Sequence, residues 1–206
     1  MAHFDLRELA PRDAYQLVTR LVGPRPIALV STLSGTGLGN LAPFSYFMMG
    51  GSNPPSCIIC PVNDRHGKPK DTLRNIEQHP EYVINACTRS MAEAMSQCSY
   101  PYDEKVDEFD RSGLSRKASS VVSPPRVAES PIGLECTRHQ IVRHGSGPLA
   151  SNYVVGEIVY VHVADELLVD GLPDNRRMSL IGRLGADWYT DVTPDSLFQL
   201  GRPETP

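Results

Sequence analysis

The chain is predicted to be a mainly β protein with peripheral helices. Its 206 residues include 18 prolines and 16 glycines, which suits a turn-rich β fold better than a helix bundle. Short runs of β-forming residues recur between these turns. No repeat or linker divides the chain. We therefore expect a single domain over residues 1–206, with a core from about 21 to 189 and a loose tail over 190–206.

An amphipathic helix is predicted first, over Pro11–Val22. Tyr15, Val18 and Leu21 recur at helical spacing and give this segment an apolar side.

A β-hairpin is predicted next, from Ile27–Leu33 and Leu41–Phe47 joined by the turn Ser34-Gly35-Thr36-Gly37. Small polar side chains, Ser31 and Thr32, stand where large apolar ones are usual. Such positions leave room for a flat ligand against the sheet. The alternative is an ordinary half-buried hairpin whose hydroxyl groups face water.

A third strand over Ser56–Pro61 leads to a short helix over Lys70–His79. Asp71 or Thr72 is the expected N-cap, and Pro80 ends the helix. Four basic residues crowd its N-terminus: Arg65, His66, Lys68 and Lys70. Cations, free amide groups and the helix dipole together predict an anion site, with phosphate as the usual anion. A solvated basic loop is the alternative.

The second half of the chain is expected to complete the sheet. A strand over Tyr82–Ala86 precedes one or two helices between Met91 and Arg111, broken at Pro101, and then an irregular Ser/Pro-rich crossing. Further strands are predicted at three places: Leu134–Arg143, Tyr153–Val163 and Leu167–Val169.

Composition excludes several classes of protein. The net charge of −4, with basic residues gathered only in one loop, argues against nucleic-acid binding. Five scattered cysteines argue against a disulfide framework and for a reducing compartment, so we expect a cytoplasmic location. No apolar run is long enough for a membrane span, and the N-terminus lacks the apolar stretch of a secretory signal.

Other motifs give no rival chemistry. Cys57 and Cys60 point to opposite faces of a strand and are expected to be core residues rather than metal ligands. The glycines at 35, 37 and 39 lack dinucleotide-binding spacing, and no Walker, G-x-S-x-G or H-E-x-x-H motif occurs.

Several segments in sequence order resemble the flavin reductase-like family of FMN-binding split barrels. They are RPIALVST, NLAPFSYF, KDTLRNI, the strand from Tyr82, the strand from Val155, and IGRLGADWY over 181–189. The resemblance implies a Greek-key split β-barrel. Two departures stand out: Ala186 replaces a glycine common in the family, and residues 91–125 match no motif.

The resemblance also implies a set of FMN-binding residues. Ser31 and Thr32 would bond the phosphate or ribityl chain, and Asn40 with the backbone of Ala42, Pro43, Phe44 and Ser45 would border the ring. Arg65, Lys70 and Thr72 would hold the phosphate, with Asp71 setting the loop and cap. Arg183 would reach the phosphate or ring, from its own chain or across a dimer interface.

The implied activity is NAD(P)H-dependent flavin reduction, in which hydride passes from nicotinamide to FMN without a catalytic side chain. A non-enzymatic FMN electron-transfer protein, flavoredoxin-like, is the main alternative, and a barrel that has lost its flavin is another. A homodimer is expected, with an oxygenase or another electron acceptor as further partner. The choice between NADH and NADPH stays open.

Overall fold

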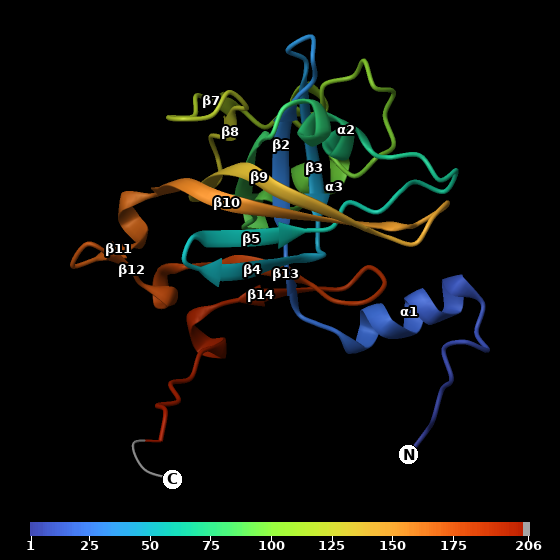
Figure 1. Cartoon of the computed structure of the whole chain (residues 1–206). Helices are drawn as coiled ribbons and strands as arrows, with labels where there is room; N and C mark the ends of the chain where they lie inside the picture. Colours follow the sequence, from blue (N-terminus) through green and yellow to red (C-terminus); the bar gives the residue numbers. More distant parts are fainter. Residues whose placement is uncertain (204–206) are drawn as a thin grey trace.

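A seven-stranded antiparallel sheet dominates the structure. We describe the chain from a computed structural model, over residues 1–203. The strands lie in the order β3-β2-β6-β9-β10-β5-β4. The sheet is strongly twisted, so that β2 and β3 run across the direction of β5 and β4 (Figure 1). Its members are β2 (Ala28–Leu33), β3 (Gly39–Phe44), β4 (Phe47–Ser52), β5 (Pro55–Ile59), β6 (Glu81–Ala86), β9 (Ile132–His144) and β10 (Ser151–Val163).

Smaller elements surround this sheet. The strands β1 (Arg25–Pro26), β13 (Leu180–Arg183) and β14 (Tyr189–Val192) form a second sheet. Two short ribbons are β7 (Arg116–Lys117) with β8 (Arg126–Val127), and β11 (Leu168–Val169) with β12 (Leu172–Pro173). The α-helices are α1 (Pro11–Leu21), α2 (Asp71–Gln78), α3 (Ala92–Gln97) and α4 (Glu108–Ser112). Single 3₁₀ turns occupy Arg89–Met91, Asp165–Leu167, Asn175–Arg177 and Pro194–Ser196. No helix in residues 1–203 is both long and apolar enough to cross a membrane.

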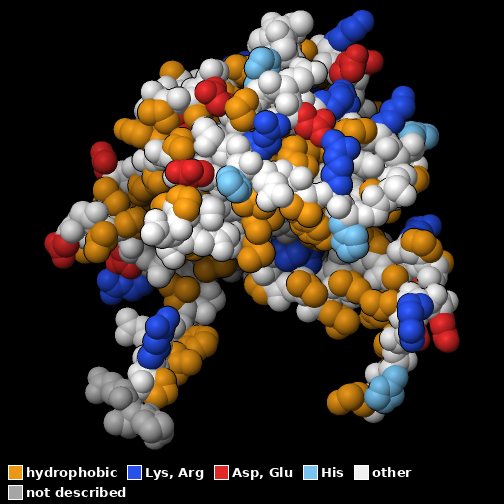
Figure 2. All heavy atoms as spheres, in the orientation of Figure 1, with side chains coloured by type: hydrophobic (Ala, Val, Ile, Leu, Met, Phe, Trp, Pro, Cys, Tyr) orange, Lys and Arg blue, Asp and Glu red, His pale blue; other side chains and the backbone are white. Residues whose placement is uncertain are grey.

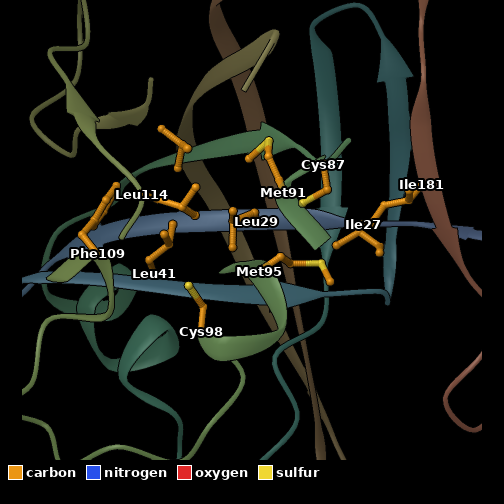
Figure 3. Close-up of a cluster of buried hydrophobic side chains, with 11 residues drawn as sticks. Ile27, Leu29, Leu41, Cys87, Met91, Met95, Cys98, Phe109, Leu114 and Ile181 are labelled. Carbon is orange, nitrogen blue, oxygen red and sulfur yellow. The ribbon is translucent and has the colours of Figure 1, made fainter. Parts of the chain in front are cut away.

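The strand β2 is buried on both faces, which explains its nearly continuous apolar run. On one face Ala28 and Val30 join a cluster that includes Tyr82 of β6 and Leu73 of α2. On the other face Leu29 joins a cluster formed with α3 and α4 (Figure 3). Members of that second cluster, drawn in Figure 3, include Ile27, Leu29, Leu41, Cys87, Met91, Met95, Cys98, Phe109, Leu114 and Ile181. Helices therefore cover both sides of the hairpin formed by β2 and β3.

A long hairpin of β9 and β10 forms the middle of the sheet (Figure 1). Its register shifts twice, between Val155 and Gly156 and between Ile158 and Tyr160, which marks two β-bulges. Gly156 is required at the first bulge because a Cβ there would overlap the hydroxyl of the buried Tyr82. The bulges bend the hairpin, and Tyr82 fills the space above the glycine.

The crossing segment before β9 is held by a buried carboxylate. Glu135 is fully buried and accepts backbone hydrogen bonds from Ser120 at 2.6 Å, Val121 at 2.7 Å and Val122 at 3.0 Å. The Nε2 atom of His162 lies 2.5 Å from the same carboxylate. Burial disfavours ionisation of Glu135, but these hydrogen bonds outweigh it and lower its pKa. An irregular segment is thereby fixed to the central sheet.

The mainly β architecture with peripheral helices is confirmed, and most elements lie within two residues of their predicted bounds. Strand β4 was missed because its second half, Gly50-Gly51-Ser52, has no β-forming side chains. The predicted cap is wrong: Lys70 occupies the N-cap position of α2, and no side chain caps that helix in the described part of the chain. The crossing was predicted as irregular but contains the short strands β7 and β8.

The ends of the chain also differ from expectation. The tail predicted over 190–206 begins later, because β14 pairs with β13 as far as Val192; residues 204–206 lie outside the described residues. Helix α1 forms as predicted, yet its apolar residues Tyr15, Leu21 and the adjoining Val22 remain exposed. In Figure 1 this helix lies apart from the large sheet. It contacts the C-terminal segment, where Gly185 packs directly on Arg20.

Candidate functional site

Two adjoining pockets lie at the end of the β2–β3 hairpin, where it meets α2. The first, here called the aromatic pocket, encloses about 610 Å³, and the second, called the acidic pocket, about 430 Å³. Pro43, Lys70 and Ser99 line both, so the two form one continuous cleft. Volumes of this size are typical of sites for small molecules and cofactors.

The aromatic pocket is built from several separate parts of the chain. The end of β3 and the following turn supply Phe44, Ser45 and Tyr46. The C-terminal segment supplies Arg183 and Tyr189, among others. Helices α1 and α3 contribute further walls through Tyr15, Gln16, Thr19 and Met95. The mixture of aromatic, apolar and small polar side chains is suited to a planar ring with polar edges.

Arg183 forms one wall of the aromatic pocket and is held in place by its neighbours. Its guanidinium lies 4.4 Å from the centroid of the Tyr189 ring and donates a hydrogen bond to the carbonyl of Ala186. Ala186 adopts a φ of +52°, in the left-handed region that favours glycine. The position at which this chain departs from the family pattern is therefore one where glycine would relieve backbone strain.

Arg25 is a second cation at this pocket, and its guanidinium is hydrogen-bonded to backbone carbonyls of the pocket wall. It donates to the carbonyl of Thr19 at 2.8 Å, to that of Val22, and to that of Leu184 at 2.9 Å. These bonds join the end of α1 to the C-terminal segment. Its Nε atom is buried and has no hydrogen-bond partner within residues 1–203.

The N-terminus of α2 opens into the acidic pocket. The amides of the first turn of a helix have no carbonyl partner within that helix, and Asp71 and Thr72 of this turn line the pocket. Lys68 and Lys70 bring two cations to the same place. Free amides at the positive end of a helix dipole, with lysines beside them, can hold an anion.

Lys70 stands at the junction of the two pockets. Its Nζ atom lies 5.8 Å from the centroid of the Phe44 ring, so a cation meets an aromatic face there. Desolvation by the pocket walls lowers the pKa of Lys70, and the nearby Asp64 partly offsets this effect. An incoming anion would stabilise the charged form of this lysine.

A buried polar network fixes the floor of the acidic pocket. The side-chain amide of Asn40 donates to the hydroxyl of Thr32 and to that of Thr72, both at 3.0 Å. The amide of Asn75 donates to the same Thr32 hydroxyl at 2.9 Å. The network ties β2, β3 and α2 together with every member at most 7% exposed. The structure thus brings three predicted site residues, from three elements, into direct contact.

Four of the five carboxylates around the acidic pocket are bound by neighbours or open to solvent. Asp64 accepts the amides of His66 and Lys68, both at 2.8 Å. Arg74 pairs with Asp71 and, at 3.2 Å, with Glu104. Asp103 is exposed and accepts the amide of Lys105 at 3.1 Å. Burial raises the pKa of Asp71, as do Glu104 and Asp103, whereas Arg74 lowers it.

Glu108, the fifth carboxylate, is buried in the floor of this pocket. It comes from α4 and accepts the amide of Leu41 at 3.0 Å. Burial raises the pKa of Glu108 to about 7, with a further increase from Asp71 and Asp107 and a partial offset from the Leu41 amide. No cationic side chain pairs with it in the described part of the chain. Near neutral pH a large fraction of Glu108 is therefore an uncharged acid.

Most of the predicted site residues lie in the cleft, but two lie elsewhere. Ser31 is fully buried on the opposite face of β2, where its hydroxyl donates to the Pro125 carbonyl at 2.5 Å. Arg65 is exposed, donates to the ring of His66 at 3.1 Å, and lines neither pocket. Thr32 lies beneath the acidic pocket, where its hydroxyl accepts hydrogen bonds from Asn40 and Asn75. The others line one or both pockets: Asn40, Ala42, Pro43, Phe44, Ser45, Lys70, Asp71, Thr72 and Arg183.

Sequence reasoning missed several pocket residues. Glu108 and Met95 come from the segment that matches no motif, so nothing in the sequence pointed to them. Arg25 stands inside the RPIALVST segment and Tyr189 ends the closing one, so both carried a signal that the analysis of charge and spacing did not use.

The cleft fits a flavin nucleotide. A flavin mononucleotide has a planar ring with polar edges and a phosphate at the end of a flexible chain. The aromatic pocket suits the ring, and the amides of α2 with Lys70 suit the phosphate. The small residues Ala42, Pro43 and Ser45 leave space where the two pockets join.

Comparison with known proteins agrees with this fit. The family model described as flavin reductase like domain matches residues 22–179. The structure superposes on nitrilotriacetate monooxygenase component B from Bacillus cereus with a TM-score of 0.91 and 29% identity, covering 97% of this chain and 98% of that chain. It also superposes on the 2-nitrobenzoate 2-nitroreductase of Pseudomonas fluorescens with a TM-score of 0.88 and 31% identity, covering 98% and 97%.

A third solved structure carries the fold name. It is a protein of Shewanella frigidimarina named as a flavin reductase with split barrel domain, and it superposes with a TM-score of 0.81 and 27% identity over the full length of both chains. The sheet described above therefore has the split-barrel architecture that the sequence motifs predicted. The chain belongs to the flavin reductase-like family, a family of flavin-binding oxidoreductases with this fold.

Proposed function

We propose that the protein binds FMN in the two-pocket cleft and oxidises NADH or NADPH, with the flavin as hydride acceptor. The observation that carries this proposal is the position of Lys70, between a ring-sized aromatic pocket and the free N-terminus of α2. A ring in the first pocket and a phosphate in the second would both contact this one side chain.

The residues of the cleft have distinct tasks in this proposal. Lys70, Thr72 and the first amides of α2 bind the phosphate. The backbone of Ala42–Ser45 borders the ring, and Arg183 with Tyr189 closes the pocket from the C-terminal side. The Asn40 amide keeps the Thr72 hydroxyl oriented, because that hydroxyl accepts from Asn40 and retains its own proton to donate.

No side chain is required to move a proton in the hydride step. A bound flavin supplies the redox chemistry, and the protein contributes binding and orientation. The aromatic pocket is large enough at about 610 Å³ to leave room beside the ring for a nicotinamide. Ser31 and Arg65 have no task in the proposed complex.

Flavin affinity tests the phosphate assignment. Replacing Lys70 by alanine is expected to weaken FMN binding by about 10- to 100-fold, the usual loss for a charge-assisted hydrogen bond. Riboflavin lacks the phosphate and keeps only the ring contact with Lys70, so its affinity should fall much less than that of FMN. Lys117→Ala, which removes an exposed lysine that lines neither pocket, is the matched control. Equal losses for FMN and riboflavin in Lys70→Ala would refute the assignment.

Visible absorbance of the purified protein tests the activity. Flavin bands that co-elute with the protein and bleach under anaerobic NADH or NADPH would support the reductase. Bound flavin that neither nucleotide bleaches would favour the flavoredoxin-like electron carrier instead. Comparing the two nucleotides in the same assay gives the preferred reductant.

The proposed electron acceptor and assembly follow from two observations. A structural relative is named as a component of a monooxygenase, which supports an oxygenase as recipient of the electrons.

Exposed apolar residues lie on β4, β10 and α1, and their exposure supports a homodimer. They include Met48, Met49, Tyr160, Val161 and Leu21. Figure 2 shows open space between the N-terminal segment and the C-terminal tail, each carrying hydrophobic side chains. A monomer in sedimentation at full flavin occupancy would contradict the dimer.

A further inference from the structure

The acidic pocket combines two features that conflict in a phosphate site. Lys68, Lys70 and the N-terminus of α2 attract an anion, while five carboxylates surround the same space. A dianionic phosphate would be opposed by any carboxylate left charged and unpaired in a partly desolvated pocket. Whether the pocket can bind a phosphate therefore depends on which of its carboxylates is charged and lacks a partner.

The charges of four of the five carboxylates are either paired with neighbouring groups or screened by water. Asp71 and Glu104 share Arg74, and Asp64 is occupied by two amides of its own loop. Asp103 is exposed, so water screens its charge. Glu108 is different because it is only 6% exposed and has no cationic partner in the described part of the chain. Its pKa of about 7 means that solution pH changes its charge near neutrality.

Glu108 is also fixed in position. Its Oε2 atom accepts the amide of Leu41, the residue between Asn40 and Ala42 that line the same pocket. The side chain therefore cannot swing away from an incoming anion without leaving a buried amide unbonded. The groups that line the pocket with it include Lys70, Asp71 and Thr72 at the start of α2 and the thiol of Cys98 after α3. Asp107, the N-cap of α4, precedes Glu108 in the chain and pairs with Arg116 at 2.7 Å.

We propose that Glu108 is a specificity-determining residue of the flavin site: its neutral acid admits the phosphate of FMN, and its carboxylate form repels it. This inference rests on the proposed function, since it takes the acidic pocket to be the place of the phosphate. The protein then selects FMN over riboflavin at and below neutral pH and loses that selection in alkaline solution.

The size of the effect follows from proton linkage. Burial places the pKa of Glu108 at about 7. If only the neutral acid admits the phosphate, the dissociation constant of FMN rises by about 25-fold between pH 6.5 and pH 8.5. Riboflavin carries no phosphate, so its dissociation constant does not follow this curve.

The experiment measures FMN and riboflavin affinity from pH 6.5 to pH 8.5 by flavin fluorescence, for the wild type and for Glu108→Gln. Glutamine keeps an oxygen for the Leu41 amide and stays neutral at every pH. At pH 6.5 the variant should bind FMN as tightly as the wild type. Between pH 6.5 and pH 8.5 its dissociation constant for FMN should lack the rise of about 25-fold that is expected of the wild type. The FMN phosphate and Lys70 are present in both proteins, so a difference between the two pH profiles reports on Glu108. Asp195→Asn, which removes an exposed carboxylate that lines neither pocket, should behave as the wild type.

The outcomes separate this inference from the proposed function. Identical pH profiles for wild type and Glu108→Gln, or the same profile for riboflavin as for FMN, would overturn the role of Glu108 alone. FMN binding that is absent, or indifferent to Lys70→Ala, would overturn the phosphate site and the inference with it. If Glu108→Gln does not fold, the wild type still decides: an FMN-to-riboflavin affinity ratio that is flat with pH overturns the proposal.

Discussion

Removing the hydroxyl of Thr32 tests the buried network beneath the acidic pocket. Thr32→Val replaces the hydroxyl by a methyl group of similar size, so no cavity forms. Two buried amide hydrogens, one on Asn40 and one on Asn75, then lose the oxygen they bond at 3.0 Å and 2.9 Å. An unsatisfied buried donor costs about 1–3 kcal/mol, so the variant should lose about 2–6 kcal/mol of unfolding free energy. Asn40 keeps its bond to Thr72.

Urea unfolding followed by far-UV circular dichroism measures this loss. Thr32→Ser is the matched control, because it keeps the acceptor and removes only a methyl group, at about 1 kcal/mol. FMN affinity should also fall in Thr32→Val, since Asn40 and Thr72 line the pocket. A Thr32→Val protein as stable as Thr32→Ser would show that the hydroxyl does not hold the two amides, and the reasoning would fail.

Two further predictions concern stability. Glu135→Gln should lower the free energy of unfolding by about 3 kcal/mol at pH 7. The reason is that a buried carboxylate, bonded by three amides and His162, loses its charge. The pKa of Glu135 is lowered in the folded state, so its stabilisation is present above the unfolded value, near pH 4.3, and is lost as the pH falls through the folded value. Chemical unfolding between pH 3 and pH 7 should show the gap between wild type and variant closing in acid; a constant gap would contradict this account. Ala186→Gly should raise Tm by about 2 °C, since glycine relieves a φ of +52°. Ala164→Gly, where φ is −65°, should lower Tm instead, and calorimetry that ranked the two variants the other way round would disprove the strain argument.

Much of the fold could be predicted because its signals are local. The hairpin of β2 and β3 and the long strands β9 and β10 are runs of β-forming residues between turns, and each appears near its predicted bounds. The N-cap of α2 was missed because Asp71 and Thr72 are both good cap residues, yet Thr72 is turned inward to the Asn40 network and Asp71 pairs with Arg74. Tertiary contacts engage both candidate side chains, and Lys70 occupies the N-cap position instead.

The site was predictable where a motif and a chemical role coincide, as for Asn40, Lys70 and Thr72. The site was not predictable where the alternation of side chains along a strand decides which of two neighbouring residues faces the pocket. Ser31 and Thr32 are neighbours with similar side chains, and they face opposite sides of β2, so only Thr32 reaches the network under the acidic pocket. Glu108 depends on a contact between α4 and β3, 67 residues apart along the chain, which no spacing rule reports.

The walls of the aromatic pocket have a consequence for how such proteins diverge. The part of the chain that matches the family model ends at residue 179 and begins at residue 22. Tyr15, Gln16 and Thr19 precede that range, and Arg183, Leu184 and Tyr189 follow it. The outer wall beside the proposed ring site is therefore built from the two segments that flank the region matched by the family model. Arg25 and the contact of Arg20 with Gly185 join these two segments. Substitutions in the flank that precedes residue 22 can therefore change what enters beside the ring while leaving the Asn40 network and the start of α2 untouched.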